Sequence, residues 1–138
     1  FNPEESVQLQ GNTGPFVQYT HARIAAIVRK AAEDDVKFKD LSFSEQITKV
    51  NEREKEVIML AAKYRDKLKE AADNYDPSVI AQYIFDLAKE YNRFYAEVSI
   101  FNETDNNLVS FRVALSKLVA ETIKSGMLLL GIQVPERM

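Results

Sequence analysis

Two aromatic side chains and one arginine follow each other at helical spacing near the start of the chain. They are Phe16, Tyr19 and Arg23, within the stretch GNTGPFVQYTHARI (residues 11–24). Aromatic rings and guanidinium planes are groups on which unpaired nucleic-acid bases stack. The same side chains can instead pack against an apolar loop at residues 38–43. The spacing alone does not decide between a base-stacking platform and plain packing.

The residues needed for a self-contained active site are missing. The chain has no cysteine and a single histidine, and it contains no GxxxxGK[ST] or GxGxxG phosphate loop, no HExxH metal motif and no GxSxG elbow. His21 falls on the apolar stripe of its helix, which predicts a hydrogen-bonded core histidine; a direct ligand contact is the alternative. Glu52, Glu54 and Glu56 are expected to be solvated at a helix N-terminus. We predict no catalytic residue and no metal site.

Charge is distributed unevenly along an acidic protein. The net charge is −3 and the isoelectric point about 5.3, which argues against a generic nucleic-acid binder. From Gly11 to Ala32, however, there is no acidic residue, while Arg23, Arg29 and Lys30 are present. The region containing the three residues above is therefore locally basic.

Two further groups of cations allow two interpretations each. The run from Lys63 to Lys69 is interleaved with Asp66, which favours a solvated helix face over a phosphate-contact surface. Arg112 lies on an apolar helix face, where an unpaired charge is costly. It is either a structural arginine, paired with a carboxylate or extended to solvent, or an arginine that faces a ligand groove.

The chain shows no sign of a membrane or secretory protein. No apolar run approaches the roughly 18 residues that span a bilayer, and there is no signal-peptide core. Together with the lack of cysteine, this predicts a cytoplasmic protein. Because the chain begins with Phe1 and not with Met, we expect a piece of a longer protein.

Hydrophobic periodicity predicts an all-α bundle of four to five helices, preceded by a short extended lead-in. Residues 1–13 lack a helical period, and 6–10 alternate as a strand or extended arm would. The expected helices span 15–32, 51–72 with a bend near 62–66, 77–99 with Asp76 as its N-cap, and 106–130 ended by Gly131. The long connection between the first two, residues 33–49, holds Phe38, Leu41 and Phe43, which are expected to attach it to the bundle. Residues 14–138 form one predicted domain.

The apolar stripes predict which positions are buried. The predicted stripes are Val17, His21, Ile24, Val28 and Ala31; Val57, Leu60, Ala61, Tyr64, Leu68 and Ala71; Ile80, Ile84, Leu87, Tyr91, Phe94 and Val98, with a second face at Ala81, Phe85, Ala88, Asn92 and Tyr95; and Leu108, Phe111, Leu115, Leu118, Val119, Thr122 and Ile123.

Four blocks in order resemble a known family. They are GNTGPFVQYTHARI, DPSVIAQYIFDLAKEYNRFY (76–95), FRVALSKLVAETIKSGMLLLGI (111–132) and the terminal VPERM. The sequence resembles the C-terminal anticodon-binding (DALR-type) domain of arginyl-tRNA synthetase, whose entry pattern is approximately G-x-x-G-P-Y-x-Q-Y-x-x-x-R. The resemblance extends over essentially the whole chain. It implies an all-α bundle, in agreement with the periodicity.

The resemblance also implies tRNA-binding residues. Phe16 matches the aromatic after Gly-Pro, Arg23 the arginine seven residues later, Tyr95 the tyrosine of the second block, and Met138 the terminal methionine near the anticodon. Gln18, Tyr19, Asn92 and Arg112 lie in the same blocks and are added as candidates. Phe16 stands where the family often has tyrosine, so stacking would survive there but a phenolic hydrogen bond would not.

The implied function is recognition of the anticodon stem and loop of tRNA-Arg. The catalytic domain of the parent enzyme, which attaches arginine to tRNA-Arg with ATP and Mg, would lie before residues 1–13, which would then be its linker. The expected partners are tRNA-Arg and that catalytic domain, with no cofactor in this chain and a monomeric state. A helical protein–protein interaction module without RNA binding is the alternative that fits the acidic charge and the amphipathic helices.

Overall fold

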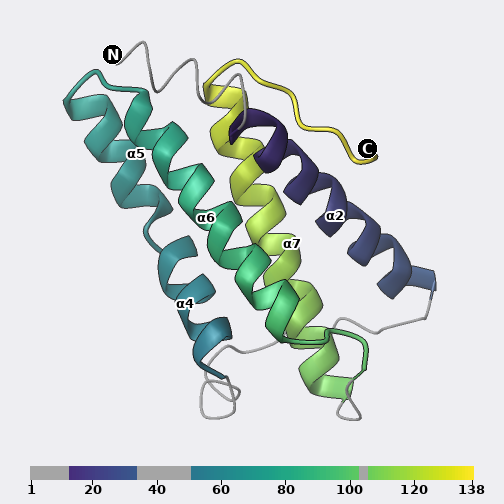
Figure 1. The fold of residues 1–138 in the computed structure, drawn as a ribbon. Coiled ribbons are helices and arrows are strands. Elements are labelled where there is room, and N and C mark those ends of the chain that lie inside the picture. The colour runs from purple at the N-terminus through teal and green to yellow at the C-terminus, as the bar shows by residue number, and fades with distance from the viewer. Residues whose placement is uncertain (1–12, 34–50, 103–105) are drawn as a thin grey trace.

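The computed structural model describes residues 13–33, 51–102 and 106–138, which form helices and no strands. The helices are α2 (Gly14–Glu33), α4 (Glu52–Ala61), α5 (Tyr64–Asp73), α6 (Ser78–Glu97) and α7 (Asn106–Leu129). The predicted all-α bundle is confirmed (Figure 1). The lead-in at 6–10 and the apolar residues Phe38, Leu41 and Phe43 lie outside the described residues.

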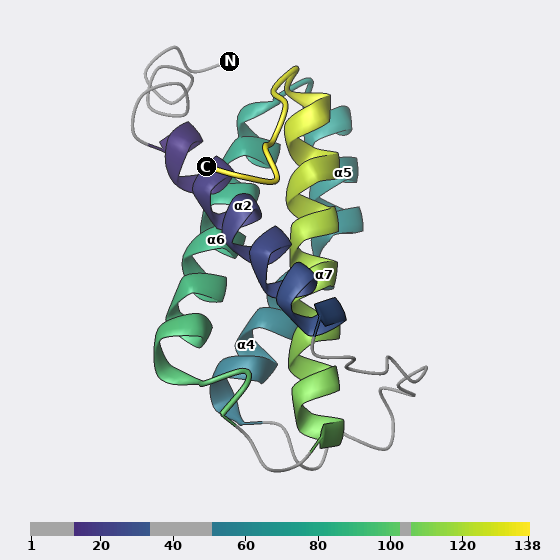
Figure 2. The same cartoon turned by 90° about the vertical axis from the view of Figure 1, so that its right-hand side faces the viewer.

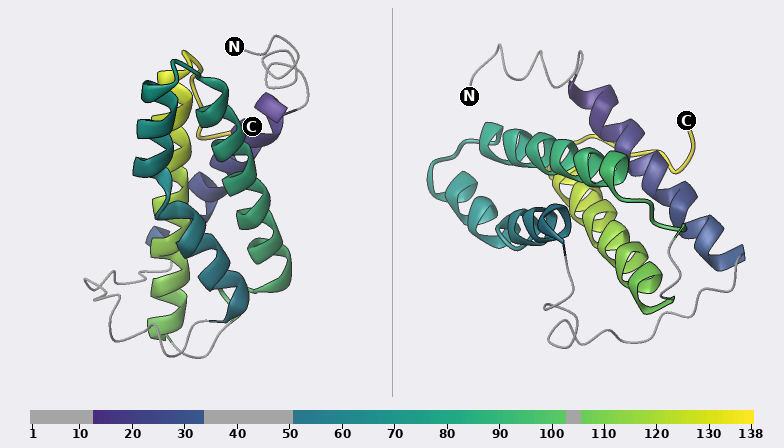
Figure 3. Two further views of the ribbon diagram at one scale, coloured as in Figure 1. Left: turned by 90° about the vertical axis from the view of Figure 1, so that its left-hand side faces the viewer. Right: turned by 60° about the horizontal axis from the view of Figure 1, so that its bottom comes forward.

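The bundle is organised around α6 and α7. The helix α7 packs against α2, α6 and α4, and α6 also packs against α4, α5 and α2. Consequently α4 and α5 lie on one side of α6 and α2 on the other, as Figure 3 shows. This arrangement explains the two apolar faces predicted for α6.

The helix α2 differs from its predicted bounds, 15–32, by one residue at each end. Its inner side chains Val17, Ile24 and Ala31 are fully buried. Val28 is only half-buried, and Ile27, one residue earlier, is buried in its place. The apolar contact therefore extends from the predicted stripe toward Ile27.

The bend predicted near residues 62–66 is a real break between α4 and α5, at Ala62 and Lys63. The helix α4 begins with a capping box, in which Asn51 Oδ1 accepts from Glu54 N at 2.9 Å and Asn51 N donates to Glu54 Oε2 at 3.2 Å. Such a reciprocal cap satisfies two backbone donors at the helix start. The bend is confirmed, and the charged segment forms two helices.

The prediction that Glu54 is solvated is wrong. Its side chain is fully buried, and Oε1 accepts from Arg112 Nε at 2.8 Å. A helix N-terminus explains the acidic side chains at Glu52 and Glu56, which are exposed. For Glu54 it explains only the Oε2 atom in the capping box, because the partner of Oε1 lies 58 residues away.

The helix α6 begins at Ser78, one residue later than expected, so its N-cap residue is Pro77 and not the predicted Asp76. Asp76 nevertheless bonds to the start of the helix. Its carboxylate Oδ1 accepts from Ser78 N at 3.0 Å and from Ser78 Oγ at 2.6 Å. These bonds lower the pKa of Asp76 from 3.8, because they favour its charged form. The predicted inner face of α6 is buried from Ile80 to Val98.

The helix α7 ends near Gly131, as predicted, and the chain then reverses direction. Gly131 has a φ of 76°, a left-handed conformation that glycine adopts without strain. Ile132 N donates to Met127 O at 2.8 Å, which closes the turn. Residues 132–138, called the tail below, run back beside α2 (Figures 1 and 2). Leu118, predicted to face inward, is 38% exposed, so this prediction is wrong.

None of the helices in the described ranges is long and apolar enough to cross a bilayer.

Candidate functional site

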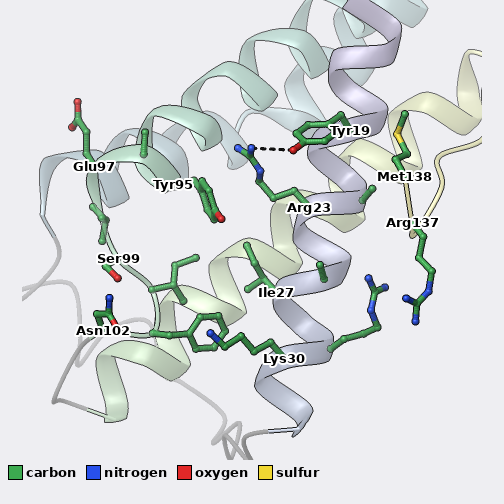
Figure 4. A pocket seen from close by; sticks show the side chains of 17 residues that line it. Tyr19, Arg23, Ile27, Lys30, Tyr95, Glu97, Ser99, Asn102, Arg137 and Met138 are labelled. Atoms are coloured by element: carbon green, nitrogen blue, oxygen red, sulfur yellow. Dashed lines mark hydrogen bonds between the residues drawn. The ribbon is translucent and has the colours of Figure 1, made fainter.

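A pocket of about 880 Å³ opens where three distant segments meet. One wall is the outer face of α2, another is the chain from Tyr95 to Asn102 at the end of α6, and the third is Arg137 and Met138 of the tail. Figure 4 shows Arg23 between Tyr19 and Tyr95, with Arg137 and Met138 beside α2. Four residues predicted as binding residues line this pocket: Tyr19, Arg23, Tyr95 and Met138.

Arg23 stacks on two tyrosine rings. Its guanidinium carbon lies 4.4 Å from the centre of the Tyr95 ring and 5.0 Å from that of Tyr19. A guanidinium at this distance is attracted by the negative face of the ring. Tyr19 is 48% and Tyr95 40% exposed, so both rings keep accessible surface. The site therefore offers flat aromatic surface next to a positive charge.

Hydrogen bonds hold the guanidinium in place. Arg23 Nη1 donates to Asn92 Oδ1 at 2.6 Å, and Nη2 makes a longer contact of 3.4 Å to the Tyr19 hydroxyl. The Asn92 amide nitrogen donates to Thr20 Oγ1 at 2.8 Å and to Ala88 O at 2.7 Å. Asn92 does not line the pocket, and its predicted contact with tRNA stays a prediction. In the structure its amide orients Arg23.

The pocket has an excess of positive charge. Arg23, Arg29, Lys30 and Arg137 line it together with one carboxylate side chain, Glu97. That carboxylate is paired with Arg53 of α4, outside the pocket. The Lys30 ammonium lies 4.4 Å from the centre of the Phe101 ring, a second cation–aromatic pair at the far end of the pocket. A local surface of this kind favours an anion, although the whole chain is acidic.

Arg112 lies outside the pocket lining. It is 8% exposed, is paired with Glu54, and donates through Nη1 to Ser99 O at 3.1 Å. Of its two interpretations, the carboxylate-paired structural arginine is the one that the structure shows. Because Ser99 is a pocket residue, Arg112 supports the pocket wall from behind.

Phe16 and Gln18 also lie outside the pocket lining. The half-buried Phe16 ring packs edge-on against Phe85 of α6, with ring centres 5.7 Å apart. Phe16 and Arg23 share a helix side, but seven residues of helix separate them by about 10 Å along the axis. Gln18 Nε2 donates to Gln133 O of the tail at 2.9 Å. Tyr95 is thus the second ring beside Arg23 in the pocket, and the tRNA-binding roles of Phe16 and Gln18 stay predictions.

Sequence reasoning did not single out the other half of the pocket. Phe101 lies in a loop and Arg137 in the tail. Neither segment has a hydrophobic periodicity from which a pocket residue could be predicted. Arg29 and Lys30 were visible only as part of the acid-free segment. In the described ranges, no three His, Asp or Glu side chains gather as a metal site would require. His21 is buried, as predicted for a core histidine, and is hydrogen-bonded to the tail.

Comparison with known proteins agrees with this architecture. Residues 17–138 match the model of the family described as the DALR anticodon binding domain. Curated relatives include two arginine–tRNA ligases. The one from Flavobacterium psychrophilum is 54% identical, and the match covers all of this chain and 22% of that protein. The one from Amoebophilus asiaticus is 49% identical, and the match covers all of this chain and 23% of that protein. The chain thus spans less than a quarter of the curated relatives that it matches.

Solved structures give the same result. The arginyl-tRNA synthetase of Thermus thermophilus superposes with a TM-score of 0.79 at 29% identity, covering all of this chain and 23% of that one. A putative arginyl-tRNA synthetase from Campylobacter jejuni gives a TM-score of 0.76 at 27% identity, covering 96% of this chain and 29% of that one. From the family match and these relatives, the chain belongs to the DALR anticodon binding domain family.

Proposed function

We propose that this chain is the anticodon-binding part of an arginine–tRNA ligase and that it binds the anticodon arm of tRNA-Arg at the pocket of Tyr19, Arg23, Tyr95 and Met138. The observation that carries the proposal is the Arg23 guanidinium held between two partly exposed tyrosine rings. Family membership favours this function over a protein–protein interaction module.

The pocket provides the interactions that single-stranded RNA requires. An unpaired base gains about 1–3 kcal/mol when it stacks on an exposed aromatic ring such as Tyr95. The Met138 side chain is 70% exposed, and its thioether can adapt to the face of a base. Arg29, Lys30 and Arg137 offer charges to the phosphates that follow the loop. Bases and backbone thus have separate partners in one pocket.

Attachment of arginine to tRNA with ATP belongs, in this proposal, to the remainder of a longer parent protein. This chain contributes positioning: it binds one end of the tRNA, so that the other end reaches the catalytic part. We propose a monomer, in which residues 1–13 link the two parts.

The test is binding of the 138-residue chain to transcribed tRNAs at several salt concentrations. We expect tRNA-Arg to bind more tightly than a transcript that differs only in the anticodon loop. With three pocket cations, Arg29, Lys30 and Arg137, assigned to phosphates, the slope of log affinity against log salt should be about −2, from roughly −0.7 per phosphate contacted. Equal affinity for both transcripts would contradict the proposal.

A further inference from the structure

Three side chains of α2 bind the backbone of the tail. Gln18 Nε2 donates to Gln133 O at 2.9 Å, His21 Nδ1 to Pro135 O at 2.9 Å, and Arg29 Nη1 to Glu136 O at 3.1 Å. At 100° per residue, these three positions fall within an arc of about 80° on the helix. One side of α2 therefore carries donors that match three carbonyl groups of the tail.

The chemistry of these bonds fixes one further detail. A carbonyl oxygen only accepts, so His21 must carry a proton on Nδ1 to bond with Pro135. His21 is only 7% exposed, and the bond to Pro135 gives its buried Nδ1 atom a hydrogen-bond partner.

Apolar contacts hold the same segment from its inner side. Ile132 and Val134 are partly buried and pack against the core, and the Gly131 turn directs the chain toward α2. The tail is thus held both by apolar packing, at residues 132 and 134, and by backbone hydrogen bonds, at residues 133, 135 and 136. Its last two residues, Arg137 and Met138, then reach the pocket (Figure 4).

We infer that Gln18, His21 and Arg29 are positioning residues, which bind the tail backbone and so place Arg137 and Met138 at the RNA site. This inference rests on the proposed function for its RNA part. Gln18 and His21 do not line the pocket, so their contribution to RNA binding passes through the tail. Arg29 lines the pocket as well as binding Glu136, and it therefore has both roles.

The first experiment measures tail docking without RNA. Because the chain has no cysteine, Val134→Cys introduces a single thiol at a partly buried tail position. Its rate of reaction with a disulfide reagent reports how often the tail leaves α2. Gln18→Ala and Arg29→Ala should each raise this rate about three- to tenfold, the effect of one lost hydrogen bond.

Matched controls separate tail docking from general loosening. Gln82→Ala removes an exposed glutamine that bonds Asp86 within α6, and Arg65→Ala removes an exposed arginine of α5. Both should leave the labelling rate within twofold of the parent. His21→Ala is expected to raise the rate most, but its burial makes it the variant that could also unfold the chain. If Gln18→Ala and Arg29→Ala leave the rate unchanged, the inference is overturned.

The second experiment asks whether Gln18 acts through the tail. Its effect on tRNA-Arg affinity is measured in the parent chain and in a chain carrying Arg137→Ala and Met138→Ala. If Gln18 is a positioning residue, its replacement by alanine weakens binding only in the parent chain. In the second chain, the Arg137 and Met138 side chains that Gln18 would position are already absent. An equal loss in both backgrounds would show a direct RNA contact and overturn the assignment.

The two experiments also distinguish this inference from the proposed function. If the parent chain does not discriminate between transcripts while thiol labelling rises as expected, the proposed function fails and tail docking by α2 stands. If tRNA-Arg binds specifically and labelling does not respond, tail docking fails and the proposed function stands.

Discussion

Arg112 of α7 and Glu54 of α4 form a buried ion pair whose atoms Nε and Oε1 lie 2.8 Å apart. Glu54 is fully buried, and both ends of the pair have further bonds, from Asn51 N to the carboxylate and from Arg112 to Ser99 O. The pair therefore connects the cap of α4, the N-terminal part of α7 and the pocket wall. Burying two charges is tolerated because each has a charged partner and additional hydrogen bonds.

Replacing one member of this pair should lower the free energy of unfolding more than replacing both. Arg112→Met leaves a buried carboxylate without its counter-charge and should lower the free energy of unfolding by about 3–5 kcal/mol. In the double variant Glu54→Met, Arg112→Met no charge is stranded, so its loss should be smaller than that of the single variant. Urea denaturation measures both. A loss below about 1 kcal/mol for Arg112→Met would show that the pair is not closed in solution.

The exposed ring of Tyr95 is expected to stack with RNA. Tyr95→Ala should weaken tRNA-Arg binding about 5- to 150-fold, the equivalent of one lost base stack. Tyr95→Phe keeps the ring and should bind within about threefold of the parent. Tyr75→Asn serves as the control, because Tyr75 is 92% exposed, lies at the other end of α6 and has a positive φ that asparagine tolerates. Equal affinities of the Ala and Phe variants would argue against stacking.

Gly126 allows α7 to approach α6 closely. A Cβ atom at this position would lie 2.6 Å from Ile84 Cδ1 and 2.7 Å from Ile84 Cγ1, and Ile84 is fully buried. Gly126→Ala should therefore destabilise the chain by about 1–3 kcal/mol, although alanine is the better helix former.

Thermal or urea unfolding checks this expectation, with the exposed neighbour Lys124→Ala as a control that should change stability by less than about 0.5 kcal/mol. Ile84→Ala removes both atoms that the new methyl group meets. The double variant should consequently lose less than the sum of the single variants, and strict additivity would contradict the proposed steric conflict.

Stability should decline in alkali partly because of Tyr91. Burial raises the pKa of Tyr91 well above its ordinary value of 10.0, and its hydroxyl donates to Ser116 Oγ at 2.8 Å. Above pH about 10 the unfolded chain releases this proton while the folded chain keeps it, so stability falls as pH rises. Below pH about 10, Tyr91 makes its full contribution to the free energy of unfolding.

Tyr91→Phe removes the titrating group and should give a shallower loss of unfolding free energy between pH 8 and pH 11.5, measured with urea. Tyr83→Phe should act in the same direction, because burial also raises the pKa of Tyr83. An unchanged slope in both variants would contradict the assignment.

Helical periodicity predicted the fold well because the contact faces of the helices are continuous apolar stripes, two of them on α6. The break between α4 and α5 and the start of α6 just after Asp76 and Pro77 were visible from local residue types alone. Glu54 and Leu118 were mispredicted for a different reason: their environment depends on which helix lies opposite. A carboxylate near a helix start is usually solvated, and only the position of Arg112 in space makes this one buried.

The pocket could be predicted only in part. Tyr19 and Arg23 share a helix, and their spacing placed them together. Tyr95 and Met138 were predicted from the family resemblance. They lie 72 and 115 positions after Arg23 in the sequence, and helical periodicity does not connect residues so far apart. Asn92, predicted as a contact, faces Arg23 and not the pocket, because its amide is used between α2 and α6.

Because α2 binds the backbone carbonyl groups of the tail, docking depends on the path of the tail backbone and on few of the tail's own side chains. The side chains of Gln133 and Glu136 point to solvent and are exposed, while Ile132 and Val134 carry the apolar contacts. Evolution can therefore exchange residues at 133 and 136 at little cost, whereas a deletion of one residue between 131 and 136 would shift the carbonyl groups that follow it out of register. Related sequences should accordingly keep the length of this segment more strictly than its composition.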